Sequence, residues 1–181
     1  MTSASRFLTF SAPDSSPEAA CKASLRQLKN ILQRQVSNHQ SRIYNPGWQA
    51  AYLYVANAVL NDARCANRRF YFLLCIDGYL NLAHSYSVAK AAARGLLFMA
   101  MSKKLLSGSD CKVILHQFQA LPDYHDPLEG LRGKFIVDLD NSLSEPGAAT
   151  VSDLAAKFEE FVTFENYTTG GDFDGAHMAK P

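Results

Sequence analysis

The sequence predicts an all-α fold of about six helices around a central apolar helical hairpin at residues 66–104. Three observations lead to this fold class. Apolar residues recur at steps of three and four along most of the chain, which is typical of helix faces. Helix start signals precede several of these stretches. Only KFIVDLDNSL, residues 134–143, is short, apolar and β-branched, and it predicts an extended segment near 134–139.

The first predicted helix starts at Ser16 and Pro17, because proline is favoured at the first helical position. Glu18 then lies near the positive end of the helix dipole. We expect the helix to end near Asn38. Residues 1–16 are rich in Ser, Thr, Ala and Pro and predict a flexible lead-in. The apolar stripe of the helix consists of Cys21, Leu25, Leu28, Leu32 and Val36.

The second predicted helix has the most regular apolar face in the sequence. Asn45 and Pro46 supply its N-cap and first residue, and Asn61 and Asp62 end it. The face consists of Trp48, Ala51, Tyr52, Val55, Ala56, Val59 and Leu60.

The central hairpin is RRFYFLLCIDGYLNLAHSYSVAKAAARGLLFMAM. Its first helix, residues 66–83, is apolar on most sides, which predicts a central position in the fold. The break falls at HSYS, where either serine could cap a second helix that runs to about Lys104. Asp77, Lys90 and Arg94 interrupt the apolar run, and one charge at a bilayer centre costs about 3 kcal/mol. We therefore expect a core element and no membrane span. Its apolarity also predicts further cover from a partner surface or a larger parent protein.

Two further helices follow in the second half of the chain. The stretch from Ser107 to Asp110 predicts the cap of a fifth helix, and Ser152 with Asp153 predicts the cap of the last one. LPDYHDPLEG between them has the composition of a loop. The expected organisation is a lead-in at 1–16, a helical domain at 17–164 and an acidic, mobile tail at 165–181.

The net charge of +1 conceals a strong asymmetry. Residues 1–120 hold 14 basic and 5 acidic residues, whereas residues 121–181 hold 4 basic and 12 acidic ones. Such a division is typical of interaction surfaces or of an acidic tail. The basic residues of 19–61 are too dispersed to indicate a nucleic-acid site and are expected to form a solvated helix face.

The cysteines and the N-terminus indicate the cellular location of the protein. No two of the four cysteines have C-x-x-C spacing, and two lie in apolar runs, so we expect reduced thiols. The N-terminus lacks the apolar region of a secretory signal. Both observations predict an intracellular protein.

FIVDLDNSL is the one stretch that resembles an enzyme motif, the nucleophile strand of haloacid-dehalogenase-type phosphatases. That resemblance implies Asp138 as the nucleophile, Asp140 as the acid/base and a metal ion between them. Ser142 stands where that family usually has threonine. The residues after Leu143 show no alternating strand–helix pattern from which to complete the required parallel sheet. A metal-dependent phosphatase is therefore kept as the alternative function.

Cys75, Asp77 and His84 lie on or just after one predicted helix and are the other set of residues that could form a catalytic group. We expect instead that Cys75 packs in the core and that His84 ends its helix. Asp77 is expected to be buried and to pair with an arginine or a hydroxyl, and Arg94 is a candidate partner. The remaining histidines have no metal-ligand spacing. The sequence thus predicts no catalytic, cofactor or metal site and no cofactor.

Most of residues 47–164 resembles the C-terminal part of the all-helical regulatory region of fungal zinc-cluster transcription factors. The resemblance rests on GWQAAYLYVANAVL, on the hairpin, and on LLSGSDCKVILHQF. It continues through FIVDLDNSL and VSDLAAKFEEFVTF, which correspond to an extended segment and a final helix in that family. The family's six closely spaced zinc-binding cysteines are absent, so the resemblance implies no direct DNA binding by this chain.

The resemblance implies a non-enzymatic regulatory or interaction domain that acts in transcription and is located in the nucleus, with shuttling to the cytoplasm left open. It also implies protein partners. The acidic tail of this chain, residues 165–181, is compatible with an activation segment. A small apolar ligand, a homo-oligomer and a plain helical scaffold or adaptor are left open. Residues that could line an apolar pocket are expected to serve mainly as core: Tyr52, Phe70, Leu74, Tyr79, Met99 and Met101.

Overall fold

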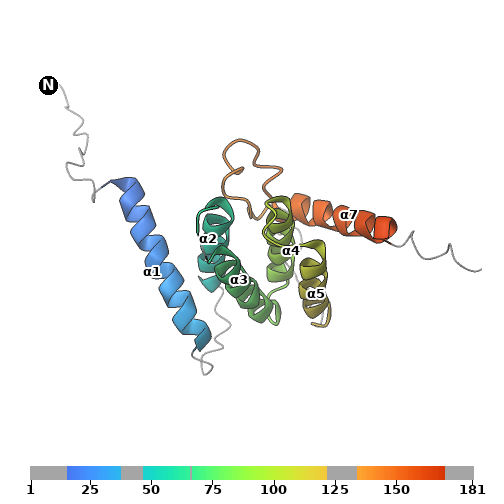
Figure 1. The fold of residues 1–181 in the computed structure, drawn as a ribbon, viewed down its shortest axis with the longest axis horizontal. Helices are drawn as coiled ribbons and strands as arrows, with labels where there is room; N and C mark the ends of the chain where they lie inside the picture. The colour runs from blue at the N-terminus through green and yellow to red at the C-terminus, as the bar shows by residue number, and fades with distance from the viewer. Residues whose placement is uncertain (1–15, 38–46, 66, 122–133, 170–181) are drawn as a thin grey trace, which may run out of the picture. The chain divides into compact units, whose positions relative to one another are not determined.

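The computed structural model describes residues 16–37, 47–65, 67–121 and 134–169. Within these ranges the chain forms six helices and a short extended segment (Figure 1), which confirms the all-α fold class. By its internal contacts the chain divides into two units, Met1–Ser41 and Arg42–Pro181. The sequence placed residues 17–164 in one domain. Each unit is described by itself below.

The first unit contains helix α1, Pro17–Ser37. The backbone N–H of Ala19 donates to Oγ of Ser16 at 3.1 Å, so Ser16 caps the helix as predicted. Glu18 and Lys22 form an ion pair of 2.6 Å one turn apart. Because both side chains are well exposed, this pair contributes little to stability. Apart from Ser16, the predicted lead-in lies outside the described residues.

In the second unit, α2 (Gly47–Asn61) packs against α3 (Arg68–Ala83). The predicted start signal at Asn45 and Pro46 lies outside the described residues. The two helices approach closely at Gly78, where an added Cβ would lie 2.3 Å from Cζ of Tyr52. The ring of Tyr52 also lies 5.9 Å from that of Tyr79, whose hydroxyl donates to the carbonyl of Gln49 at 3.2 Å. Glycine at position 78 thus makes room for an aromatic layer.

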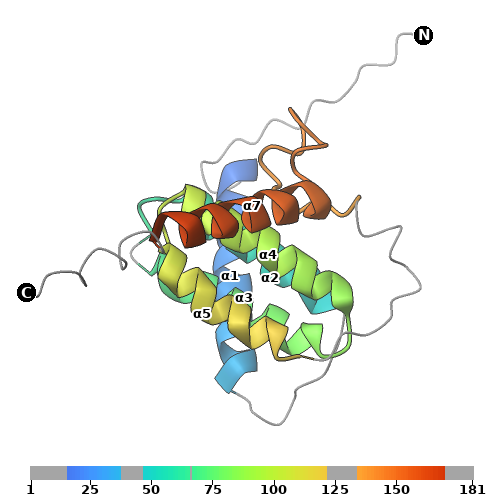
Figure 2. The same ribbon diagram turned by 90° about the vertical axis from the view of Figure 1, so that its right-hand side faces the viewer.

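Helix α4, Ser87–Ser102, follows α3 after the break at residues 84–86 and forms the predicted hairpin with it. It contacts α2, α3, α5 and α7, so it is the central helix of this unit (Figure 2). Its buried residues are mostly small, and Gly95 faces Leu154 of α7. The predicted serine cap is wrong. The N-cap is Tyr86, whose side chain makes no capping hydrogen bond, because the turn after α3 brings its extended backbone to that position.

The C-terminus of α4 leads directly into α5, Gly108–Gln119. Lys104 has a left-handed backbone, with φ 55°, and its N–H donates to the carbonyl of Met101 at 2.9 Å. The N–H of Leu105 donates to the carbonyl of Ala100 at 2.8 Å. These two bonds form a Schellman motif in which lysine occupies the position that usually holds glycine. Ser107 then caps α5 as predicted, in a reciprocal capping box with Asp110.

The predicted extended segment is present, and it makes one antiparallel bridge within the described residues, between Ile136 and Thr150. The N–H of Val151 donates to the carbonyl of Phe135 at 2.7 Å. This bridge places Thr150 directly before α7, Val151–Thr169, which crosses α4 in Figure 2. The hydroxyl of Thr150 accepts from the N–H of Asp153 at 3.4 Å. The predicted start at Ser152 is therefore wrong, because the bridge sets the cap two residues earlier.

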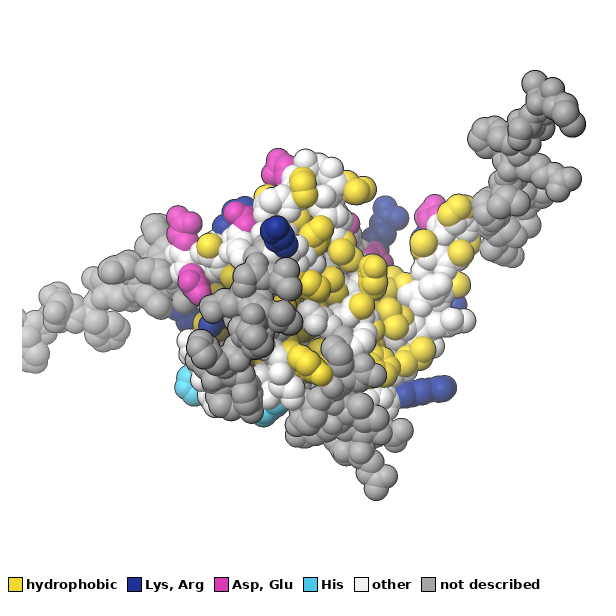
Figure 3. Space-filling model, turned by 180° about the vertical axis from the view of Figure 1, so that it is seen from behind, with side chains coloured by type: hydrophobic (Ala, Val, Ile, Leu, Met, Phe, Trp, Pro, Cys, Tyr) yellow, Lys and Arg dark blue, Asp and Glu magenta, His cyan; other side chains and the backbone are white. Residues whose placement is uncertain are grey.

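Some hydrophobic side chains remain at the surface, as the yellow atoms in Figure 3 show for one face. Among the described residues of the second unit the large exposed ones are Tyr54, Phe70, Val113 and Leu143, the last being 94% exposed. None of the helices in the described part of the chain is long and apolar enough to cross a membrane.

Candidate functional site

The extended segment is held on the helices by Asn57, a buried amide in the middle of α2. Nδ2 of Asn57 donates to the carbonyl of Leu53 at 3.0 Å and to that of Val137 at 2.8 Å. Its Oδ1 accepts from the N–H of Leu139 at 3.1 Å. One side chain thus fixes both ends of a three-residue stretch, and it sets the position of Asp138 between them.

Asp138 is the residue that organises the following turn. Its side chain is almost fully buried, at 6% exposure. Oδ1 accepts from the N–H groups of Asp140 and Asn141 at 3.1 and 3.2 Å, and Oδ2 accepts from Nδ2 of Asn141 at 2.7 Å. Both oxygens are therefore engaged in holding the turn, whereas a phosphoryl nucleophile directs an oxygen at its substrate. Asp140 is exposed. These contacts give Asp138 a structural role.

A pocket of about 280 Å³ lies where this turn meets the end of α4 and the start of α7. Its apolar lining consists of Phe98, Met99, Ala148 and Leu154. Its polar lining consists of Ser102, Lys103, Asp138, Asn141, Glu145 and Lys157. The pocket therefore combines a small apolar surface with charged groups of both signs.

The charged side chains in the lining differ in whether they form an ion pair. Lys157 forms an ion pair with Oδ2 of Asp153 at 2.7 Å. Lys103 donates to the neutral amide oxygen of Asn61. In the part of the chain that the structure describes, neither Lys103 nor Glu145 forms an ion pair with an opposite charge. Both of these side chains are exposed to solvent.

The apolar residues considered from the sequence are mostly core. Tyr52, Leu74 and Tyr79 are buried, while Met99 lines the pocket. Burial is the main cause that raises the pKa of Tyr52 to about 12, and it raises the pKa of Tyr79 further. Phe70 is half exposed, and Met101 is partly buried.

The structure does not support a catalytic group at Cys75, Asp77 and His84. Cys75 is fully buried, as expected, and His84 is the exposed C-cap of α3. The expectation of a buried Asp77 is wrong, and its candidate partner Arg94 pairs with another residue. Asp77 is exposed and accepts from Nδ2 of Asn81 at 3.4 Å, while Nη1 of Arg94 lies 3.3 Å from Oε1 of Glu159 on α7. In these two helices the aspartate lies on the solvent side and the arginine faces α7.

No cluster of three or more His, Cys, Asp or Glu side chains suited to a metal ion occurs among the described residues. None of the four cysteines forms a disulfide bond. The pocket residues Lys103, Glu145 and Lys157 were not found from the sequence, because they come from three separate elements. The role of Asn57 is indicated in the sequence only by its place as a polar residue inside the apolar stretch AYLYVANAVL.

The chain was compared with protein-family models, with curated proteins and with solved structures. None of these three comparisons finds a match. The function is therefore argued from the residues and contacts described above.

Proposed function

We propose that this chain is a helical regulatory domain of the fungal zinc-cluster transcription-factor type, which acts in the nucleus by binding protein partners. Two features support the proposal: the sequence resemblance over residues 47–164, and a surface at the start of α3. The expected order of helices, extended segment and final helix agrees with the helices found. The charge asymmetry between the two halves of the chain is also typical of an interaction protein.

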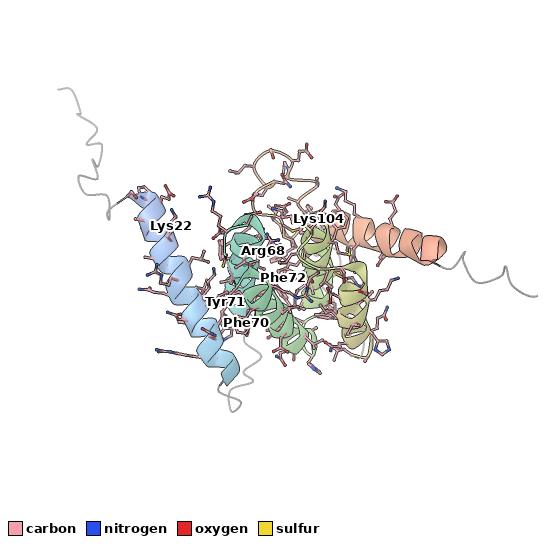
Figure 4. The ribbon with its side chains drawn as sticks, viewed as in Figure 1. Lys22, Arg68, Phe70, Tyr71, Phe72 and Lys104 are labelled. Atoms are coloured by element: carbon pink, nitrogen blue, oxygen red, sulfur yellow. The ribbon has the colours of Figure 1, made fainter. Side chains whose placement is uncertain are left out.

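The observation that carries the proposal is the aromatic–arginine surface, which we define as Arg68, Arg69, Phe70 and Tyr71 at the start of α3. Figure 4 labels Arg68, Phe70 and Tyr71. Phe70 is 50% exposed, and its ring meets that of Tyr71 edge to face with 5.3 Å between centroids. Arg69 retains 53% exposure although it pairs with Asp110 at 2.9 Å. Phe72, by contrast, is fully buried. Aromatic side chains and arginine are the types enriched at the energetic centre of protein interfaces.

A tethering experiment tests this function. The chain is fused to an unrelated DNA-binding domain, and the output of a reporter gene is measured in fungal cells. We expect the fusion to change reporter output, and we expect Phe70→Ala to abolish the change. Val113→Ala is the matched control, because Val113 is also an exposed apolar residue, on α5. A fusion that leaves the reporter at its basal level, at equal protein abundance, contradicts the proposal.

The nuclear location is tested separately with a fluorescent fusion of the full chain. Nuclear accumulation is the expected result. Exclusion from the nucleus under all growth conditions contradicts a role in transcription.

A further inference from the structure

We propose that Ser142 is a phosphorylation site for an acid-directed serine kinase, and that a phosphate there releases the extended segment from α2. The inference rests on the contacts of one turn, so it stands or fails separately from a role in transcription. Residues 139–144 form this turn, outside the helices. Opening such a turn costs less free energy than unfolding the helices around it.

The chain is acidic on both sides of Ser142. Asp140 lies two positions before the serine, and Glu145 lies three positions after it. Both carboxylates are exposed, and neither forms an ion pair among the described residues. The immediate neighbours Asn141 and Leu143 are exposed as well. A kinase with basic side chains in its substrate groove is therefore complementary in charge to this turn.

The hydroxyl of Ser142 belongs to a short series of hydrogen bonds that reaches α2. Its Oγ donates to the carbonyl of Leu139 at 2.6 Å. The N–H of the same leucine donates to Oδ1 of Asn57 at 3.1 Å. Nδ2 of Asn57 donates to the carbonyl of Val137 at 2.8 Å. The serine thus holds the carbonyl of the residue whose N–H is held by α2.

Phosphorylation removes the hydroxyl as a donor. The kinase transfers the γ-phosphoryl group of ATP: the bond between Oγ and phosphorus forms, the bond from that phosphorus to the bridging oxygen of ADP breaks, and the hydroxyl proton passes to solvent. The resulting ester oxygen cannot donate to the carbonyl of Leu139.

The phosphate also adds negative charge to an acidic turn. It carries a charge of about −1.5 to −2 at neutral pH. Asp138, Asp140 and Glu145 all lie within four residues of Ser142. Like charges placed this close repel one another, and the repulsion favours an open turn. Loss of the hydrogen bond and repulsion therefore act in the same direction, and Leu139 leaves Asn57.

Ser144 is a matched control in the same turn. It is exposed, whereas Ser142 is partly buried, so accessibility alone favours Ser144. The residue three positions after it is Gly147, which is not acidic. Its hydroxyl donates to the carbonyl of Asn141 at 3.3 Å, a bond that does not involve the segment held by Asn57.

The first test locates the phosphate. The full chain is incubated with ATP and casein kinase 2, a kinase directed to serines that precede acidic residues, and mass spectrometry identifies the modified position. We expect phosphate at Ser142 in the unaltered chain and in Ser144→Ala. The double substitution Asp140→Asn and Glu145→Gln should slow the modification, because it removes the charges that the kinase recognises.

A peptide of residues 135–148 is incubated in parallel with the full chain. Modification of the peptide but not of the chain would show that the folded turn does not open to a kinase, and this result overturns the site. Absence of phosphate from both overturns the recognition of the acidic flanks, and so does phosphate at Ser144 alone.

The second test measures the release by hydrogen exchange in the phosphorylated chain. We expect the Leu139 amide to exchange about tenfold faster, the effect of losing one hydrogen bond together with added repulsion. Amides inside α3 should keep their rates, and a phosphatase should restore the original rate of Leu139. An unchanged Leu139 amide overturns the release. A slower one also overturns it, because the phosphate would then be held by Lys103 or Lys157 in the neighbouring pocket.

Discussion

The second unit contains two regions that are held together by different means. Between α2 and α3, Tyr52 lies on Gly78, and the fit of apolar surfaces determines how closely the helices approach. Between α2 and the extended segment, the contact instead depends on the hydrogen bonds of Asn57. The first kind of contact tolerates no extra atom, and the second tolerates no missing donor or acceptor. Substitutions at the two places should therefore fail for different reasons.

Gly78→Ala should have the largest effect. The new Cβ would lie 2.3 Å from Cζ of Tyr52, so the ring must leave its place in the core. We expect a loss of about 3 kcal/mol in the free energy of unfolding, more than alanine gains in helix propensity. Urea unfolding followed by circular dichroism measures it. Gly147→Ala is the control, because an added Cβ there meets no atom within 4 Å. Equal stability of the two variants contradicts the close packing.

Asn57→Leu tests the polar region. The substitution keeps a similar volume but leaves the carbonyl of Val137 and the N–H of Leu139 without their partner in the helix. We expect a loss of about 2 kcal/mol in the free energy of unfolding. Hydrogen exchange supplies a local measurement, because the Leu139 amide loses its partner directly and should lose more protection than the amides inside α3 do. An unchanged Leu139 amide would show that Asn57 does not anchor the segment.

The same contrast explains which features the sequence could predict. The helices are predicted by periodic apolar residues and their ends by capping residues, and both signals are local in the chain. The hairpin break and the caps at Ser16 and Ser107 could therefore be predicted. The anchor by Asn57 joins residues 80 positions apart. The start of α7 at Thr150 likewise depends on its bridge to Ile136, and the pocket depends on both. Features that arise only when distant segments meet have no periodic signal in the sequence.

Ser107→Ala should have an intermediate effect, at the start of α5. The serine accepts from the N–H of Asp110 at 3.1 Å, and loss of such a cap costs about 1 kcal/mol in the free energy of unfolding. Urea unfolding at neutral pH measures the difference. Ser109→Ala controls for the loss of a nearby hydroxyl. A Ser107→Ala variant as stable as Ser109→Ala contradicts the capping box.

The cap also predicts a dependence on pH. Hydrogen bonds from Ser107, first from its backbone and then from its side chain, together with one from Arg69, lower the pKa of Asp110 to about 2. Because this pKa is lower in the folded state, the ionised carboxylate stabilises the fold above the unfolded pKa of about 3.9. That contribution should be lost as the pH falls from about 4 to about 2. Asp110→Asn should flatten this part of the stability profile, and an unchanged profile contradicts the lowered pKa.

Lys104→Gly should change the free energy of unfolding least, and it should raise this free energy where the other substitutions lower it. Lys104 lies where the end of α4 passes into the buried Leu105 and Leu106, with φ 55° (Figure 4). A left-handed residue with a Cβ costs about 1 kcal/mol, and glycine removes this cost. Part of the gain is offset by the greater freedom of glycine in the unfolded chain, so we expect a net stabilisation of about 0.5 kcal/mol. Lys104→Ala is the matched control, because it removes the same side chain and keeps the strain. If alanine stabilises as much as glycine, the lysine side chain and not its backbone conformation is unfavourable at this position.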